Sequence, residues 1–269
     1  MSLTSAEIAE LQQVAHRLAD AAARITLMQF RQPGLRTDNK AQSGFDPVTE
    51  ADRACEAAMR GILEDARPHD GILGEEFGSR PGSTGLTWIL DPIDGTRGFI
   101  AGTPTWGTLI AVAGAAGPLY GLIDQPYTGE RFEGGFGSAR LIRAGVHTPL
   151  RTGRTERLAD AILFTTFPEI GSAGERAAFG RVAERVRLTR YGMDCYAYAL
   201  LALGQIDLVI EAGLHPYDIA APIAVITAAG GVVTDWRGGP ADRGGQVLAA
   251  ANPEIHAAAL ALLTSEAES

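Results

Sequence analysis

Two aspartates directly follow an apolar run in the segment WILDPID, residues 88–94. The apolar residues predict the end of a buried strand, and Asp91 and Asp94 stand where that strand emerges. Two carboxylates so close together repel each other, and burying either one without a partner is costly. We therefore expect a positive charge between them. The spacing alone also fits a turn at Asp91 and a helix cap at Asp94, so that alternative stays open here.

Other acids also stand at predicted strand ends or helix starts; they are Asp46, Glu75, Glu76 and Asp218. Such hard oxygen ligands suit Mg²⁺, which proteins hold with a few carboxylates plus substrate phosphate oxygens. The sequence has no cluster of His or Cys that would favour zinc. Gly95 and Thr96 follow the aspartates and open a segment whose free N–H groups can receive a phosphate.

The elements that position these acids can be read from the hydrophobic pattern. An amphipathic helix is predicted within residues 1–26, and a second within 46–66, where Thr49 is the N-cap and Asp52 completes a capping box. Residues 71–78 and 87–96 predict two strands that end in acids. Residues 107–126 predict paired strands joined by a glycine-rich turn.

In the second half of the chain, predicted strands alternate with predicted helices, which favours α/β layering. The predicted strands are AILFTTFP, IDLVIEAG, VVTDW and GQVLAAAN, and the predicted helices are 173–186, CYAYALLALGQ, DIAAPIAVITAAGG and 253–264. We expect two domains, 1–145 and 146–269, because the pattern changes between them.

Composition limits the classes of function. The 269 residues carry a net charge of −9, which argues against a nucleic-acid partner. No apolar stretch reaches the 18–20 residues or so of a membrane span, and no signal-peptide pattern opens the sequence. Cys55 and Cys195 are the two cysteines, far apart in sequence, so no disulfide framework is expected. We expect a cytoplasmic protein without a membrane or nucleic-acid partner.

Four segments resemble the signature segments of the inositol monophosphatase-like, metal-dependent phosphatases. They are DPVTEAD (46–52), GEE (74–76), DPIDGT (91–96) and PYDIAA (216–221). The resemblance covers nearly the whole chain. It implies an α/β (α+β) fold, the layered αβαβα sandwich of the inositol monophosphatase and fructose-1,6-bisphosphatase type. It also implies two or three Mg²⁺ per active site, a small phosphorylated substrate and a homodimer.

Position by position, the resemblance implies a set of site residues in this sequence. The metal ligands would be Glu75, Asp91, Asp94 and Asp218 with the carbonyl of Ile93. The first domain thus carries most ligands, and the second carries Asp218. Glu75 would also take part in catalysis, Thr96 and Asp46 would orient the attacking water, and the N–H groups of Gly95 and Thr96 would contact the phosphate. Bound metals would make the adjacent carboxylates tolerable.

The leaving-group pocket differs from that of inositol phosphatases, which carry Gly-Ser/Thr-Ala-Ala where this chain has GMDC at 192–195. This stretch, and Arg97 directly after DPIDGT, resemble histidinol-phosphate phosphatases of the same superfamily. Histidinol carries an ammonium group and an imidazole, whereas inositol is neutral. Carboxylates at Asp194 and Glu211 would suit a cationic leaving group.

Alternative roles remain for each of these pocket residues. Asp194 could instead cap the helix that follows it. Glu211 could be an exposed strand end, and Arg97 could contact either substrate or a neighbouring acid. Tyr196 and Tyr198 are expected in the core.

The resulting hypothesis is a Mg²⁺-dependent phosphate monoester hydrolase acting on L-histidinol phosphate, in histidine biosynthesis. The alternatives are an inositol-1-phosphate or broad-specificity sugar phosphatase with the same chemistry, and a non-catalytic protein that keeps the fold. An intact set of acids speaks against the last alternative, because a binding role would not need them.

Overall fold

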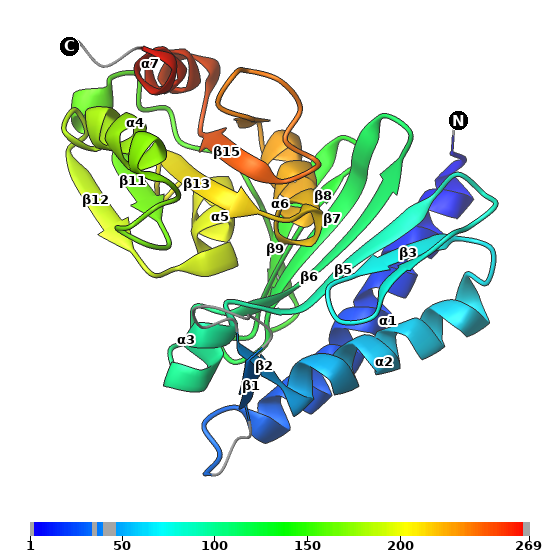
Figure 1. Cartoon of the computed structure of the whole chain (residues 1–269). Helices are drawn as coiled ribbons and strands as arrows, with labels where there is room; N and C mark the ends of the chain where they lie inside the picture. Colours follow the sequence, from blue (N-terminus) through cyan, green and yellow to red (C-terminus); the bar gives the residue numbers. More distant parts are fainter. Residues whose placement is uncertain (1–2, 34–36, 40–46, 266–269) are drawn as a thin grey trace.

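Two long helices, α1 (Ser5–Gln29) and α2 (Glu50–Ala66), pack against each other and form the first layer of the chain (Figure 1). The structure is a computed structural model and describes residues 3–33, 37–39 and 47–265. Each helix begins with a capping box, Thr4 with Glu7 and Thr49 with Asp52. The predicted N-terminal helix and the predicted cap at Thr49 are therefore confirmed. A short antiparallel pair, β1 (Thr37–Asn39) and β2 (Pro47–Thr49), precedes α2.

The second layer is an eight-stranded sheet with the order β10-β9-β8-β7-β6-β5-β3-β4. Its strands are β3 (Gly71–Gly74), β4 (Gly78–Arg80), β5 (Thr87–Asp94), β6 (Gly107–Gly114), β7 (Gly117–Gln125), β8 (Glu130–Gly135), β9 (Ser138–Arg143) and β10 (Val146–Pro149). Neighbouring strands are antiparallel except β3 and β5, which run parallel, so both end at the same edge. A core that includes Leu18, Met59, Trp88 and Leu122 joins this sheet to α1 and α2.

The middle layer consists of α5 (Asp194–Ala202) and α6 (Pro216–Ala228), which lie between the two sheets (Figure 1). The apolar helix α6 lies very close to the first sheet because glycines face it. A Cβ atom at Gly121 would lie 2.3 Å from the carbonyl oxygen of Ala221, and one at Gly134 would lie 2.6 Å from the Cα of Val225. This close approach fixes the N-terminus of α6 over the sheet.

The fourth layer is a five-stranded sheet with the order β12-β11-β13-β15-β14. Its strands are β11 (Ile162–Thr165), β12 (Leu188–Tyr191), β13 (Leu208–Leu214), β14 (Val232–Thr234) and β15 (Gly245–Ala250). β11 pairs in parallel with both β12 and β13, whereas β15 is antiparallel to its neighbours.

The outer layer is formed by α4 (Ala173–Ala183) and α7 (Pro253–Thr264), which cover the far face of the second sheet. The succession of layers is therefore αβαβα, as expected. Two short helical segments complete the chain, α3 (Thr96–Ala101) and a 3₁₀ turn (Leu158–Asp160). The predicted boundary between 145 and 146 lies at the turn between β9 and β10, and the division into domains stays a prediction.

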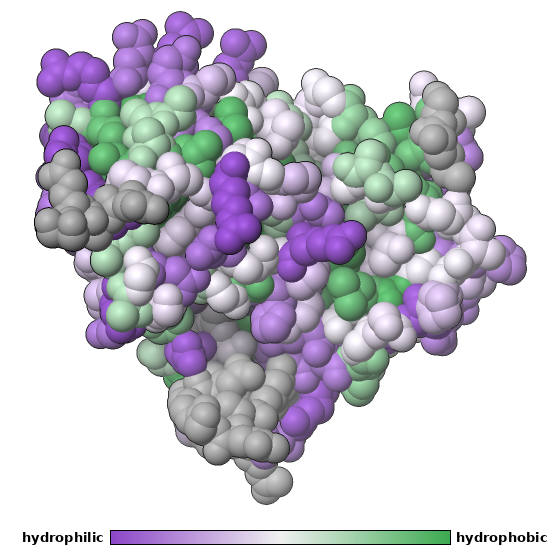
Figure 2. All heavy atoms as spheres, turned by 45° about the horizontal axis from the view of Figure 1, so that its top comes forward, coloured by the Kyte–Doolittle hydropathy of each residue, from purple (hydrophilic) through white to green (hydrophobic). Residues whose placement is uncertain are grey.

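On the face drawn in Figure 2, apolar side chains form small groups between polar ones. The most exposed large apolar side chains include Met28, Val146 and Phe77. Among the described residues, none of the helices combines the length and apolar character needed to span a membrane.

Candidate active site

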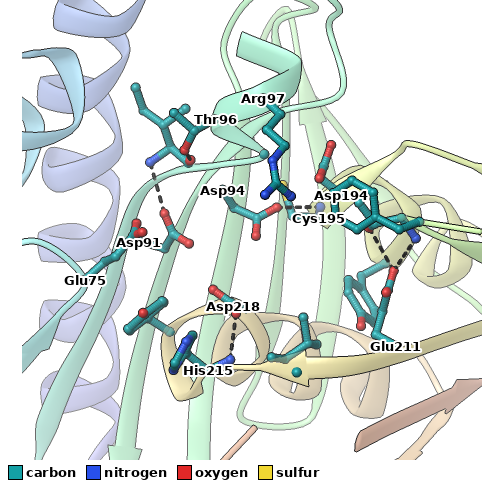
Figure 3. Close-up of a pocket in the computed structure, with 18 of the residues that line it drawn as sticks. Glu75, Asp91, Asp94, Thr96, Arg97, Asp194, Cys195, Glu211, His215 and Asp218 are labelled. Atoms are coloured by element: carbon teal, nitrogen blue, oxygen red, sulfur yellow. Dashed lines mark hydrogen bonds between the residues drawn. The ribbon is translucent and has the colours of Figure 1, made fainter. Parts of the chain in front are cut away.

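Three carboxylates meet where β5 ends and α6 begins (Figure 3). Asp91 and Asp94 lie on β5, and Asp218 lies in the first turn of α6. One carboxylate oxygen from each of the three lies within 4.8 Å of the others. Residues separated by more than 120 positions in sequence thus form one acidic cluster.

An irregular pairing of β5 brings Asp91 and Asp94 to the same side. Asp91 pairs with Leu109 of β6, whereas Asp94 pairs with Gly107, so β5 has one extra residue between them. In a regular strand, residues three apart would face opposite sides of the sheet. The extra residue forms a bulge, a feature that re-aims side chains. The Thr108 hydroxyl, which donates to the Pro92 carbonyl over 2.8 Å, fixes this segment.

Local hydrogen bonds then hold each acid. The Ile93 N–H donates to Asp91 Oδ1 over 3.1 Å, and the His215 N–H donates to Asp218 Oδ2 over 2.7 Å. His215 is the N-cap residue of α6, and its ring stacks on Tyr217.

The cluster has the electrostatics of a cation site. Asp91 is buried, and this burial, followed by the charge of Glu75, raises its pKa well above the ordinary value. Burial and the charge of Asp194 do the same for the pKa of Asp94. Burial raises the pKa of Asp218 to about 6. Because all the candidate ligand atoms are hard carboxylate oxygens whose charges repel one another, the residues fit a hard divalent cation.

A second acidic cluster lies beside the first and includes a residue missed in the sequence. Asp52, Glu75 and Glu76 each offer a carboxylate oxygen, and these oxygens lie within 4.8 Å of one another. Asp52 is buried, accepts the Thr49 N–H over 2.8 Å, and burial raises its pKa to about 6. We interpreted Asp52 in the sequence only as a capping residue, although it lies inside the quoted DPVTEAD segment. Asp46 lies outside the described residues.

Thr96 begins α3 directly after the N-cap Gly95, whose φ is 82°. The Thr96 hydroxyl donates to the carbonyl of Ile93 over 3.0 Å. This bond uses the hydroxyl hydrogen and leaves the oxygen able to accept a hydrogen bond from another group.

Asp194 lies inside α5, one residue after the N-cap Met193, so the helix-cap alternative was wrong. Its φ of 46° is in the left-handed region, which Asp and Asn adopt more readily than most residues. Burial raises the pKa of Asp194 to about 6, while the charge of Arg97 acts in the opposite direction. The carboxyl packs against Gly95, where a Cβ atom would lie 2.9 Å from its carbon.

Glu211 lies near the end of β13 and is only 6% exposed, so the exposed strand-end alternative was also wrong. Its carboxylate accepts the Thr166 N–H over 2.7 Å, the Thr166 hydroxyl over 2.8 Å and the Thr165 hydroxyl over 3.1 Å. Burial raises its pKa to about 7 despite these bonds.

One cavity of about 340 Å³ is lined by many of these residues, namely Glu75, Asp91, Asp94, Thr96, Asp194, Glu211 and Asp218 (Figure 3). The guanidinium of Arg97 lies 4.8 Å from the centre of the Phe167 ring, another wall residue that the sequence did not reveal. Tyr198 is buried as expected but also lines the cavity, and its hydroxyl has no hydrogen-bond partner among the described residues. Cys195 is a free cysteine with a buried side chain.

Comparison with known proteins agrees with this geometry. The profile of the Inositol monophosphatase family matches residues 7–268. A bifunctional phosphatase of Arabidopsis thaliana, IMPL2, is 42% identical over 88% of this chain and 67% of its own length. A histidinol-phosphatase of Streptomyces coelicolor is 35% identical over 90% and 92%. The solved structure of an inositol monophosphatase from Zymomonas mobilis is 40% identical, with a TM-score of 0.85 over 98% of this chain and 100% of that one.

Proposed function

Because this chain belongs to the inositol monophosphatase family, a family of phosphatases, we propose that it is a Mg²⁺-dependent phosphatase of L-histidinol phosphate. Its relatives include both a histidinol-phosphatase and an inositol monophosphatase at similar identity, so overall similarity does not choose the substrate. The observation that carries the choice is the half-buried carboxyl of Asp194 in the cavity wall.

We assign the metal to the two acidic clusters. Glu75, Asp91, Asp94 and Asp218 with the Ile93 carbonyl would hold Mg²⁺, and Asp52 is an additional acid within reach of Glu75. When bound, Mg²⁺ would help to activate water and neutralise charge on the phosphoryl and leaving oxygens. Without a cation these acids repel one another, which supports this assignment.

The residues at the start of α3 would serve the attacking water and the phosphate. The Thr96 hydroxyl donates a hydrogen bond to the Ile93 carbonyl, so its oxygen can accept a hydrogen bond from the attacking water and orient it. Asp46 is proposed as its partner in this role, and Glu75 as a further catalytic acid. The N–H groups of Gly95 and Thr96 are proposed to bind the phosphate.

Two carboxyl groups in the cavity wall favour a substrate whose leaving group is cationic. Asp194 and Glu211 lie beyond the metal acids on the cavity wall, and Arg97 is the cation next to Asp194. Above pH 6 an ionised Asp194 can form a charge-assisted hydrogen bond with an ammonium group. Inositol offers only hydroxyls and cannot form this charge-assisted bond. We propose Arg97 as a substrate-binding residue that also limits repulsion between Asp194 and the metal acids.

The test compares L-histidinol phosphate with inositol 1-phosphate in the wild type and in Asp194→Asn at pH 8. Asn adopts the left-handed φ of this position, so the backbone is kept while the charge is lost. A charge-assisted bond contributes about 1.5–3 kcal/mol. We therefore expect kcat/KM for histidinol phosphate to fall about 10- to 150-fold, with little change for inositol 1-phosphate.

Other outcomes would select the alternatives. A wild type that prefers inositol 1-phosphate would favour an inositol or broad-specificity sugar phosphatase. An Asn variant that loses both activities equally would indicate damage to the shared metal site and would remove the main support for histidinol phosphate as the substrate. Absence of Mg²⁺-dependent phosphate release from any ester would favour a non-catalytic protein. We also propose a homodimer in the cytoplasm, to be tested by light scattering on the purified protein and by fractionation of its cells.

A further inference from the structure

The carboxylate of Glu56 is fully buried and lies outside the cavity lining described above. It accepts the N–H of Glu76 over 2.7 Å and the N–H of Phe77 over 3.2 Å. These two residues form the turn between β3 and β4, directly after Glu75. The Glu56 carboxylate therefore serves as the acceptor for two successive backbone N–H groups of this turn.

Arg60 holds the other side of the same turn. Its Nε donates to Glu56 Oε1 over 2.8 Å, and its guanidinium donates to the carbonyl of Gly78. The guanidinium also lies 5.9 Å from the centre of the Phe77 ring. Glu56 and Arg60, one turn apart on α2, thus contact the backbone of the turn at Glu76, Phe77 and Gly78.

Gly74, the residue before Glu75, shows how closely the Glu56 carboxylate packs against the backbone of β3. A Cβ atom at Gly74 would lie 1.9 Å from Glu56 Oε1 and 2.4 Å from its carboxyl carbon. Only a glycine can stand there while Glu56 keeps its place. The N–H of Glu75 itself donates to the Leu90 carbonyl over 3.2 Å, which links the turn to β5.

The same face of α2 reaches the acidic cluster. Asp52 lies four residues before Glu56, so both side chains project from one side of the helix. Asp52 approaches the Glu75 carboxylate, while Glu56 binds the backbone that follows it. Packing α2 on the sheet would not need a charged group at Glu56, because burying a carboxylate costs free energy that an apolar side chain would avoid.

We propose that Glu56 is a positioning residue for the metal site: it clamps the β3–β4 turn so that the Glu75 carboxylate faces Asp91. The inference rests on the proposed function, which assigns Glu75 as a metal ligand. Glu56 touches neither metal nor substrate and acts through the backbone. Partners of this kind, once removed, lower metal affinity or activity by about 10- to 100-fold.

The test measures Mg²⁺ binding by calorimetry and kcat and KM in four proteins: wild type, Glu56→Gln, Glu75→Gln and Asp70→Asn. Asp70 is the matched control, because it is a buried acid at the opposite end of β3 that accepts from Arg67, Thr84 and Trp88. We expect Glu56→Gln to raise the Kd for Mg²⁺ about 10- to 100-fold and to lower kcat at fixed Mg²⁺. Its KM should stay within about twofold, and excess Mg²⁺ should restore part of kcat. Asp70→Asn should lower Tm but leave the Kd for Mg²⁺ unchanged.

A purely structural role would reduce the number of binding-competent molecules without changing the Kd of those that fold. Suppose that Glu56→Gln binds Mg²⁺ with the wild-type Kd while Glu75→Gln binds it more weakly. This result would overturn the positioning role of Glu56 and leave the proposed function intact. If Glu56→Gln does not fold, Arg60→Gln replaces it, with a smaller rise in Kd expected and a wild-type Kd contradicting the proposal. A wild type that neither binds Mg²⁺ nor releases phosphate would overturn the proposed function and this inference with it.

Discussion

The backbone N–H of Cys195 donates to Asp94 Oδ2 over 2.6 Å and joins the start of α5 to the end of β5. The two residues are 101 positions apart in sequence. Asp94 thereby takes part in both the acidic cluster and the placement of its neighbour Asp194. Any substitution of Asp94 would disturb the metal acids and the leaving-group wall together. Asp91, whose hydrogen bond to the Ile93 N–H is local, is the cleaner probe of the metal site.

The first prediction concerns Asp91→Asn. The change removes one negative charge from a cluster that repels itself, so Mg²⁺ binding should weaken and hydrolysis should be nearly abolished. For the same reason, the metal-free variant should be at least as stable as the metal-free wild type. Phosphate release at fixed Mg²⁺ and thermal unfolding in EDTA measure the two effects. Near-normal hydrolysis would show that Asp91 is not a ligand, and a large loss of Tm in EDTA would show that its role is structural.

The second prediction concerns Thr96→Ala, with Thr96→Ser as the matched control. In the wild type, the hydroxyl donates to the Ile93 carbonyl and its oxygen is free to orient a water. Loss of this group should lower kcat by about 10²-fold or more, the lower range for a positioned proton-transfer group, with a smaller effect on KM. Ser keeps the hydroxyl and should recover most of kcat. If only KM changes, Thr96 contacts the phosphate and does not orient water.

The sequence predicted the fold well because the hydrophobic pattern is strong where elements are long. The C-terminal helix was predicted over 253–264 and lies at Pro253–Thr264. The short strand β12 and the helix α3, four and six residues long, were not predicted, because such short segments carry too little periodicity. Tertiary packing, rather than local propensity, supports them.

The site was predictable as a set of residues but not as a geometry. The motif segments supplied Asp91, Asp94 and Asp218, whereas the bulge that turns the first two to one side depends on the register with β6. The surroundings of Glu211 depend in the same way on the parallel pairing of β11 with β13, which brings Thr165 and Thr166 to it from 46 and 45 residues away. The register between strands that are distant in sequence cannot be predicted from the local pattern of a single sequence.

The last prediction uses the pKa of Glu211, which burial raises from 4.5 to about 7. The folded state then binds its proton more tightly than the unfolded state, so the contribution of Glu211 to stability is full below about pH 4.5 and is lost as pH rises toward 7. Glu211→Gln keeps the shape and most hydrogen bonds but cannot ionise. Relative to wild type, the variant should therefore gain stability between pH 5 and pH 8, on the order of 3 kcal/mol at most.

Urea unfolding in EDTA at the two pH values measures this difference. Asp70→Asn is the control, because the pKa of Asp70 is lowered and its charge does not change in this range. If the stability of wild type and of Glu211→Gln depends on pH in the same way, Glu211 is ionised throughout this range, and its hydrogen bonds from Thr165 and Thr166 stabilise the charge. Glu211 would then present its full negative charge to the leaving group even at pH 5.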